Sequence, residues 1–429
     1  MSSFTAEAVA ALPGPAWLRN QREEAFGRFS VAERPTDAED VWRYSRIGDL
    51  DLEAYEPVKL APPSPDGAPP VLPAEIQAVL DDVGDRSGLA VLFNGQLVHC
   101  ELAAAPATQG VHLGSLSALD DGAGLTGSVA GQADSYVELA TAFMADAVVV
   151  RVPRGIVVEA PIVVVHWVDA EGAAVFPRLI VDAGEMSQFT VLDYATSAPG
   201  VTSLVFPVVE LDVGDAANVS YLNIQQLGPK VWQVGYQASR VRCDATLSST
   251  TIALGGDYAR VRTDSRLAGR GGHSNLLAAY FGDAAQMHDF RTMQDHDAPK
   301  TTSDLLFKGA VEDEAHSVYS GLIRVRKGAG GTSAFQTNRN LVLTPGAQAD
   351  SVPNLEIEEN DVHCSHASAV GPVDEDQRYY LESRGVPSEV AERLIVLGFF
   401  DDIIDRSPIP ALRRRLRAAL AAKLPGVEA

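Results

Sequence analysis

A six-residue pattern recurs four times between residues 184 and 287, and it constrains the fold more than any other feature of the sequence. Each copy reads glycine, acid, any residue, small residue, polar residue, apolar residue: GEMSQF from Gly184, GDAANV from Gly214, GDYARV from Gly256 and GDAAQM from Gly282. The glycine would permit a tight corner, and the apolar residue would re-enter a strand. We therefore expect these glycines at turns between strands. The apolar residues expected to face the interior are Phe189, Val219, Val261 and Met287.

The composition and periodicity around this pattern are typical of an all-β region. From about 146 to 370, short runs rich in Val, Ile and Thr alternate with Gly, Asp and Pro, and no ten-residue window carries a helical stripe. A repeated corner suits a β-solenoid, in which every coil turns at a stacked position. The copies are 30, 42 and 26 residues apart, which would mean coils with unequal loops. A β-sandwich whose hairpins share turn chemistry fits the pattern equally well.

The chain divides into three parts: 1–145 is helical or mixed, 146–372 is the β core, and 373–429 is helical. Within the first part, a Pro-rich linker covers 61–73, a hairpin is centred on Asn94-Gly95, and a short helix covers 135–144.

A further helix of this first part is expected from Pro15 onward. We expect Trp17, Ala25 and Phe26 to share its buried face, with Arg22 among the residues outside.

The last part predicts three helical features. Asp374 with Gln377 resembles a capping box, Gly385 can end that helix, and Ser388 can cap the next. A final helix at roughly 409–424 spaces four leucines four apart, with basic residues on its other sides. These are Leu412, Leu416, Leu420, Leu424, Arg413, Arg414, Arg415, Arg417 and Lys423. An amphipathic surface helix is the favoured interpretation, and a docking surface for a partner is the alternative.

Charge and cysteine content exclude several classes of function. The net charge is −23, which argues against binding to nucleic acid or to anionic membranes. Three cysteines cannot build a disulfide framework, so a cytoplasmic location is expected. No run of 18 apolar residues is present to span a membrane, and neither a P-loop nor a G-x-S-x-G elbow occurs.

The segment from 354 to 371, NLEIEENDVHCSHASAVG, is the strongest candidate for chemistry. On a strand, Cys364 and His366 would share one face, and a thiolate beside an imidazole suits zinc or iron. Two ligands make half a site, so other donors would have to complete it, and an inert buried cysteine is the common alternative. The remaining candidates are expected to be structural. Cys100 and Cys243 are expected to be small core residues, and His288, His296 and His316 hydrogen-bonded structural histidines.

Long ordered motifs in the C-terminal half resemble the SufB/SufD scaffold proteins of the SUF iron–sulfur cluster assembly system. The resembling stretches are TTSDLLFKGAVEDEAHSVYSGLIRV, FQTNRNLVL, ADSVPNLEIEENDVHCSHASAVGPVDED and YYLESRGV, with WRYS at 42–45 near the N-terminus. The run LEI…DVHCSH…VG…D resembles the SufD form, with Cys364 and His366 at that form's Cys-Ser-His. Two departures occur: Ala-Ser-Ala follows His366 instead of Gly-Ala-Thr, and Lys300 stands where a histidine is common.

This resemblance implies a mainly β protein, a right-handed parallel β-helix flanked by N-terminal and C-terminal helical segments. It implies a non-catalytic scaffold that pairs with a SufB-like subunit, binds a SufC-like ATPase through its C-terminal helices, and forms a homodimer when isolated. A nascent iron–sulfur cluster would be shared with the SufB-like partner, with Cys364 and His366 as the metal-binding residues. A flavin is associated with such complexes, but no flavin motif occurs here. Two alternatives stay open: a β-solenoid carbohydrate-active enzyme, and a purely structural partner whose cysteine and histidine are inert.

Overall fold

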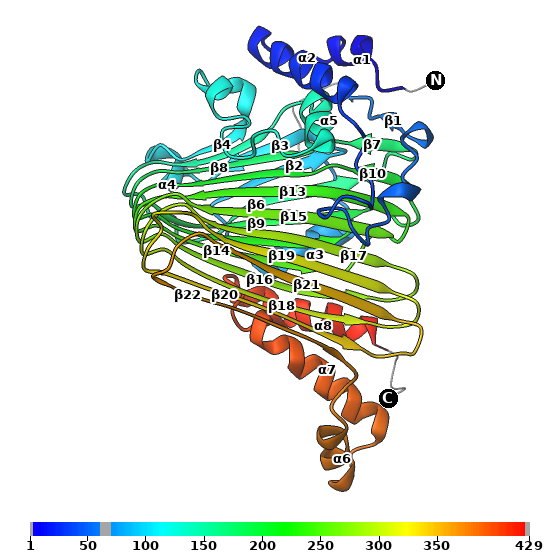
Figure 1. Ribbon diagram of the computed structural model, residues 1–429. Coiled ribbons are helices and arrows are strands. Elements are labelled where there is room, and N and C mark those ends of the chain that lie inside the picture. Colours follow the sequence, from blue (N-terminus) through cyan, green and yellow to red (C-terminus); the bar gives the residue numbers. More distant parts are fainter. Residues whose placement is uncertain (1–2, 61–69, 425–429) are drawn as a thin grey trace.

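The computed structural model describes residues 3–60 and 70–424, and its centre is a parallel β-solenoid of about eight turns. Successive strands alternate between two facing sheets, here named sheet A and sheet B, with helices at both ends (Figure 1). Strands within the solenoid pair in parallel, in register, for up to ten residues. The sandwich interpretation, whose hairpins would pair antiparallel, is therefore wrong. Antiparallel pairing joins β2 to β3 and β4 to β5, at the N-terminal end.

Sheet A runs, in spatial order, through β21 (Gln348–Ile357), β19 (His316–Val325), β17 (Met287–His296), β15 (Tyr258–Leu267), β13 (Val231–Val241), β11 (Val208–Val213), β8 (Arg178–Ala183), β5 (Val148–Val152) and β4 (His112–Ser115), with β1 (Glu56–Pro57), β7 (Ala173–Val175) and β10 (Ser203–Val205) beside this path. Sheet B runs through β22 (Val362–Gly371), β20 (Thr332–Val342), β18 (Thr302–Val311), β16 (His273–Gly282), β14 (Thr246–Ala253), β12 (Asn218–Gln226), β9 (Gln188–Ser197), β6 (Ile162–Val168), β2 (Gly88–Phe93) and β3 (Gln96–Leu102).

Coil length is nearly constant, which corrects the expectation of unequal loops. Tyr258 pairs with Met287, Met287 with His316, and His316 with Gln348. By subtraction, these three successive coils contain 29, 29 and 32 residues. The spacing of the sequence pattern was irregular because its copies lie at two opposite corners. Gly184 and Gly214 lead from sheet A to sheet B, whereas Gly256 and Gly282 lead from sheet B to sheet A.

The corner glycines lie where expected, for a partly different reason. Three of them lie between strands, and Gly282 is the last residue of β16. Gly184 has no positive φ; a Cβ there would lie 2.5 Å from the backbone nitrogen of Arg154 in the coil below. The left-handed residues of the corners come two positions later, at Met186 and Ala216 with φ of 57° and 55°. Close stacking of coils, rather than the turn itself, therefore requires glycine at this corner.

The space between the sheets is apolar in the first coils and increasingly polar in the later ones. Phe189 and Val219 are buried in the early apolar part, and Val261 is partly buried further along. Met287 corrects the expectation, because it faces the other side of sheet A, in the cluster beneath the N-terminal helices.

The N-terminal helices cover the outer face of sheet A (Figure 1). They are α1 (Ala6–Ala10), α2 (Ala16–Val31) and α5 (Ser135–Phe143), and α4 (Ala104–Thr108) lies at the hairpin; short 3-10 turns occur at Ile47–Asp49, Leu52–Ala54, Leu116–Ala118 and Gly122–Gly124. The hairpin at Asn94-Gly95 and the helix at 135–144 are confirmed. Residues 61–69 of the expected Pro-rich linker lie outside the described residues.

Arg22 was expected on the exposed face of helix α2, but its side chain is fully buried. Its guanidinium donates hydrogen bonds to the carbonyls of Met144 and Pro13 at 2.9 and 2.7 Å, and to that of Ala145. Burial lowers the pKa of Arg22 to about 10, which leaves it charged at neutral pH. Apolar spacing alone misplaces such a residue because carbonyl groups, not apolar contacts, hold it.

Helices α7 (Ser388–Ile404) and α8 (Arg413–Lys423), together with α3 (Ala74–Val83), cover the outer face of sheet B. A 3-10 turn at Pro410–Leu412 precedes α8, and α6 (Glu375–Ser383) has no buried residue and projects from the body. Asp374 caps α6 as expected, and Gly385 follows its end with a φ of 87°. Ser388 is the first residue of α7 rather than its cap. Among the described helices, none combines the length and the apolar character needed to cross a bilayer.

Candidate functional site

Cys364 and His366 lie on β22, the last strand of sheet B. β22 pairs with β20 on one side, and its other edge has no strand neighbour in the described part of the chain. The two residues share one face by strand alternation, opposite Ala334 and Gln336 of β20. Sheet A ends in the same manner at β21, so both sheets present an edge at this open end of the solenoid (Figure 1).

Cys364 is half-buried rather than freely exposed. It packs against a small cluster formed by Ile323, Val325, Ala329 and Ala334. Burial raises the pKa of its thiol, and a backbone hydrogen bond with Ala334 counteracts this only in part. The thiol is therefore protonated at neutral pH, and a nearby positive charge such as a metal ion would be needed to make it a thiolate ligand.

His366 is exposed and makes no hydrogen bond within the described residues. Its neighbour Gln336 is the opposite case: the side chain is 1 % exposed, yet both amide atoms lack a hydrogen-bond partner. No group of three or more His, Cys, Asp or Glu side chains that could hold a metal ion occurs in residues 3–60 and 70–424. Cys364 and His366 therefore lie side by side as two potential donors, of which the imidazole is the more accessible.

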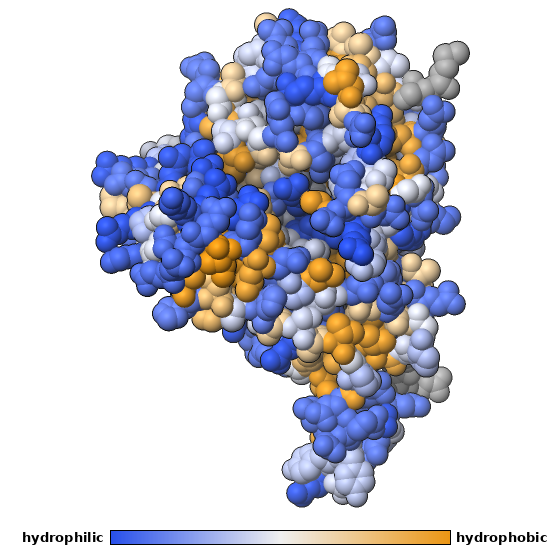
Figure 2. Space-filling view, viewed as in Figure 1, coloured by the Kyte–Doolittle hydropathy of each residue, from blue (hydrophilic) through white to orange (hydrophobic). Residues whose placement is uncertain are grey.

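The open end carries exposed apolar side chains. Phe335 and Ile357 are each 43 % exposed and Val370 is 45 % exposed, and Val352 and Leu355 are also exposed. Figure 2 shows apolar atoms gathered on the face where Figure 1 places β21 and β22. Strand edges of this length are sites for pairing with another chain unless they are covered. This open edge is therefore a candidate surface for pairing with another chain.

The last helix does not provide a docking surface with its leucines. Leu412, Leu416, Leu420 and Leu424 are all buried against sheet B and α7, as the amphipathic-helix interpretation expected. Its cations make contacts within the chain: Arg415 with Asp82, Arg417 with Asp401 and Asp405, and Lys423 with Asp283.

Exposed aromatic and apolar groups lie instead on α6 and α7. Tyr379 is 73 %, Tyr380 58 % and Leu394 52 % exposed. Helix α6 has no buried residue and extends away from the body of the molecule (Figure 1). The spacing of Val390, Leu394 and Leu397 would place these three residues on one packed face of α7. In the structure that face is formed instead by Ala391, Val396 and Phe400. The sequence therefore predicts a docking role for the C-terminal helices but does not identify these particular residues, because a hydrophobic residue was assumed to be buried.

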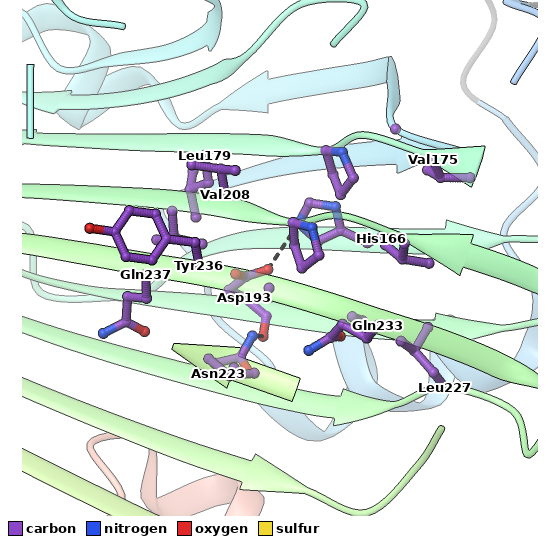
Figure 3. A pocket seen from close by; sticks show the side chains of 18 of the residues that line it. His166, Val175, Leu179, Asp193, Val208, Asn223, Leu227, Gln233, Tyr236 and Gln237 are labelled. Atoms are coloured by element: carbon purple, nitrogen blue, oxygen red, sulfur yellow. Dashed lines mark hydrogen bonds and ion pairs between the residues drawn. The ribbon is translucent and has the colours of Figure 1, made fainter. Parts of the chain in front are cut away.

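A cavity of about 50 Å³ lies between the sheets in the early coils. His166 Nε2 is 2.9 Å from Asp193 Oδ1 (Figure 3). Tyr221 donates a 2.5 Å hydrogen bond to Asp193 Oδ2. The Nδ1 atom of His166 is buried without a partner. No sequence motif pointed to this group, because its members come from three different coils.

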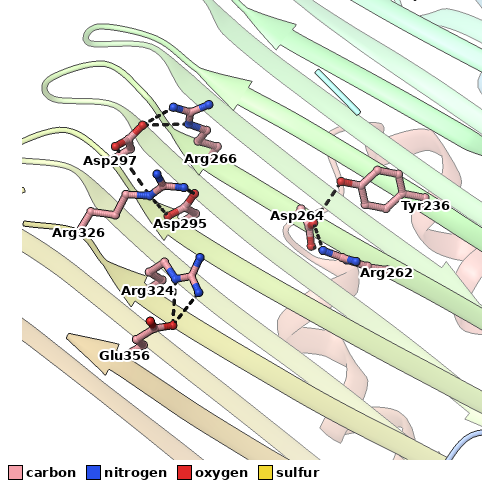
Figure 4. Close-up of polar contacts among 9 residues, drawn as sticks. All are labelled: Tyr236, Arg262, Asp264, Arg266, Asp295, Asp297, Arg324, Arg326 and Glu356. Atoms are coloured by element: carbon pink, nitrogen blue, oxygen red, sulfur yellow. Dashed lines mark hydrogen bonds and ion pairs between the residues drawn. The ribbon is translucent and has the colours of Figure 1, made fainter. Parts of the chain in front are cut away.

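The acids on the outer face of sheet A are neutralised by arginines. Arg326 binds Asp295 at 2.6 Å, Arg324 binds Glu356 at 2.8 Å, and Arg266 binds Asp297 (Figure 4). Carbohydrate hydrolysis needs a pair of carboxylates free to act as acid and base or nucleophile. The carboxylates of this ladder are instead engaged with guanidinium groups, which counts against the carbohydrate-enzyme alternative at this face.

The expectation that Cys100 and Cys243 are core residues is wrong, whereas the expectation that His288, His296 and His316 are hydrogen-bonded is confirmed. Cys100 and Cys243 are exposed rather than core residues, because Cys100 lies on the outermost strand β3 and Cys243 lies in a corner, not a strand. His288 bonds the carbonyl of Gly255, His296 bonds Thr301 and Ser303, and His316 bonds Asp350. All three histidines are structural in these contacts.

Comparison with known proteins supports an assembly role. Residues 166–399 match the family described as "SUF system FeS cluster assembly, SufBD core domain". An iron–sulfur cluster assembly SufBD family protein of Mycobacterium tuberculosis is 37 % identical over 315 residues, 71 % of this chain and 76 % of the relative. Iron–sulfur cluster assembly proteins SufD of Bacillus subtilis and Escherichia coli are 31 % and 26 % identical, covering 64 % and 72 % of this chain and 63 % and 73 % of theirs.

Proposed function

The chain belongs to the SufBD family of iron–sulfur cluster assembly proteins, and on this premise we propose that it is a SufD-like scaffold subunit without catalytic activity of its own. It would pair with a SufB-like subunit, and a nascent cluster would form at their interface as cargo. The observation that supports this most is the unpaired double edge of β21 and β22, which carries Cys364 and His366 together with exposed apolar residues.

The SufB-like subunit would extend one or both sheets at this edge. Two parallel edges offer rows of backbone donors and acceptors, and apolar side chains beside them add buried area. A second copy of this chain could occupy the same edge when no SufB-like subunit is present. The isolated chain is therefore proposed to form a homodimer in which the partner-binding edge is hidden.

Cluster iron is tetrahedral, so two donors from this chain are half of what one iron needs. His366 would supply an imidazole nitrogen, and Cys364 would supply a thiolate once the incoming cation displaces the thiol proton, which is released to water. The SufB-like subunit and sulfide would provide the remaining ligands. Iron held by the isolated chain should accordingly be weak, and the cluster should be retained only in the complex.

The SufC-like ATPase would dock on α6 and α7, through the surface formed by Tyr379, Tyr380 and Leu394. Aromatic residues with more than half of their surface exposed are typical anchors of protein interfaces. The buried leucines of α8 would act indirectly, by holding α7 on sheet B. The triple variant Tyr379→Ala, Tyr380→Ala, Leu394→Ala should lose ATPase binding without unfolding, whereas an unchanged Kd would exclude this surface.

The cluster role is tested by anaerobic reconstitution of the full complex with metal analysis and visible absorption spectroscopy. His366→Ala should lower the cluster yield, and Cys364→Ser should lower it equally or less, while both variants still assemble. His363→Ala is the matched control, since it lies on the same strand but on the opposite face. A wild-type yield from the Cys364→Ser, His366→Ala double variant would leave the chain a purely structural partner.

We further propose a cytoplasmic location and a division into 1–145, 146–372 and 373–429 as folding units. Limited proteolysis followed by mass spectrometry would test the division, since cleavage should fall near the two boundaries. Cleavage spread evenly through 146–372 would contradict it.

A further inference from the structure

The later coils of the solenoid contain buried polar atoms that lack partners. Gln336 lacks a hydrogen bond at both Oε1 and Nε2, Gln294 lacks one at Oε1, and Ser351 lacks one at Oγ. Most buried polar groups in proteins are hydrogen-bonded, and an unpaired buried amide destabilises the folded chain. An uncompensated group of this kind calls for a specific partner.

Gln336 is the one that lies directly beside the candidate cluster site. It pairs in register with His366 across β20 and β22, and neighbouring strands in a sheet are about 4.8 Å apart. Strand alternation points both side chains to the same side of sheet B. Among the described residues, the exposed imidazole and the buried amide beside it each have no hydrogen-bond partner. Within this part of the chain, the ring N–H of His366 is therefore a donor without an acceptor, and Gln336 Oε1 is an acceptor without a donor.

The depth of the Gln336 amide is fixed by its surroundings. A Cβ added at Gly321 would lie 2.5 Å from Gln336 Nε2 and 2.3 Å from Tyr319 Oη, so the missing side chain leaves room for both groups. Tyr319 Oη is already engaged with the hydroxyl of Thr292 at 3.0 Å. The neighbouring hydroxyl is thus engaged with Thr292, and neither amide atom of Gln336 bonds to it.

We propose that Gln336 is a positioning residue for His366. Its Oε1 accepts a hydrogen bond from one ring N–H of His366 after rotation of the imidazole about its side-chain torsions. This bond selects one neutral tautomer and leaves the other ring nitrogen, with its lone pair, directed toward the partner subunit and its iron. Metal-binding histidines regularly use their second nitrogen in this way, and loss of the acceptor typically weakens metal binding 10- to 100-fold. The ligand role of His366 rests on the proposed function, but the hydrogen bond does not.

The direct test is ¹⁵N NMR of the full-length chain labelled at histidine, with the His366 signals assigned from a His366→Ala sample. Gln336→Met keeps the volume and removes the amide, and it should change the tautomer ratio of His366 at least threefold. Gln336→Glu keeps an acceptor oxygen and should retain the wild-type tautomer. Gln294→Met is the matched control: it removes another incompletely paired amide from the same interior, but its register partner is Ile323, not a histidine.

The outcomes separate this inference from the proposed function. An unchanged tautomer ratio in Gln336→Met, or an equal change in Gln294→Met, would overturn the positioning role and assign the amide to buried water. Should Gln336→Met fail to fold, a changed tautomer in Gln336→Glu would overturn it instead. In the reconstituted complex, Gln336→Met should lower iron retention 10-fold or more. If His366→Ala leaves cluster yield intact while Gln336→Met still shifts the tautomer, the ligand role fails and the hydrogen bond stands.

Discussion

A buried ion pair between β8 and β11 should anchor the N-terminal cover to the solenoid. Arg178 and Glu210 have side chains 2 % and 1 % exposed, and Arg178 Nη2 lies 2.7 Å from Glu210 Oε1. The same carboxylate accepts hydrogen bonds from the backbone amides of Gly127, Val129 and Ala130 at 2.9–3.0 Å. Burial alone would raise the pKa of Glu210, but Arg178 and these amides outweigh it and hold the pKa below its usual value. One carboxylate thus ties residues 127–130 to sheet A.

Glu210→Gln preserves the shape and removes the charge, which leaves the Arg178 guanidinium buried without a counter-ion. Such a loss costs about 3–5 kcal/mol in unfolding free energy. Arg178→Met should cost a similar amount. The double variant Arg178→Met, Glu210→Leu should cost at least about 2 kcal/mol less than the sum, because no charge stays unpaired. The cost that remains reflects the backbone amides that lose their acceptor.

Urea denaturation at pH 7, followed by circular dichroism, measures these differences. The matched control is Glu356→Gln, because the Arg324–Glu356 pair is 35 % and 44 % exposed and should contribute less than about 1 kcal/mol. The Glu210 contribution should be present above the ordinary carboxyl pKa and be lost as the pH falls through its lowered folded-state value. A cost below 1 kcal/mol for Glu210→Gln, or strict additivity in the double variant, would refute this reasoning.

Three further changes test other parts of the structure. Burial lowers the pKa of His296 to about 4. The chain should therefore keep the full stabilising contribution of this residue above pH 6.5 and lose about 3 kcal/mol of unfolding free energy as the pH falls to 4. His296→Asn should make the melting temperature depend less on pH over that range, and an unchanged pH dependence would contradict this. Leu416→Ala should destabilise the chain by about 2–5 kcal/mol, whereas Leu394→Ala should lie within about 0.5 kcal/mol of wild type, both by urea denaturation; equal costs would be inconsistent with the buried stripe of α8. Gly309→Ala should cost about 1–3 kcal/mol in the same assay, since its Cβ would lie 2.0 Å from the Tyr280 ring, and a neutral effect would show that the ring can move.

The sequence predicts the architecture well where local chemistry repeats. Asn94-Gly95 specifies a two-residue turn with φ of 49° and 79°, and the structure has that hairpin. The corner pattern locates the coil boundaries, although Gly184 is required by the coil stacked against it rather than by its own turn. Such a contact joins residues about 30 positions apart, and no local rule can anticipate it.

Burial is predicted less reliably from residue type at Arg22, Leu394 and Gln336 than at the repeated corners. Arg22 is buried because three carbonyl groups converge on it, whereas Leu394 is exposed although it fits a helical stripe. Gln336 was missed because inward-facing polar residues on β20 reverse the usual pattern of apolar residues inside. Cys364 and His366 were singled out from their spacing, and no group of three or more possible metal ligands occurs in the part of the chain that the structure describes.

The two ends of the solenoid are finished differently, and this difference argues for an assembly role. At the N-terminal end, β3 and β4 run antiparallel to their neighbours, and β3 is a seven-residue hairpin strand on which Val98 is the exposed large apolar residue. At the C-terminal end, β21 and β22 keep the parallel direction, span ten residues each and expose apolar side chains. A long parallel edge of this kind is an aggregation hazard unless a partner covers it. The end that the fold leaves open is also the end that bears Cys364 and His366, the two proposed ligands, so one partner would cover the edge and complete the ligand set in the same step.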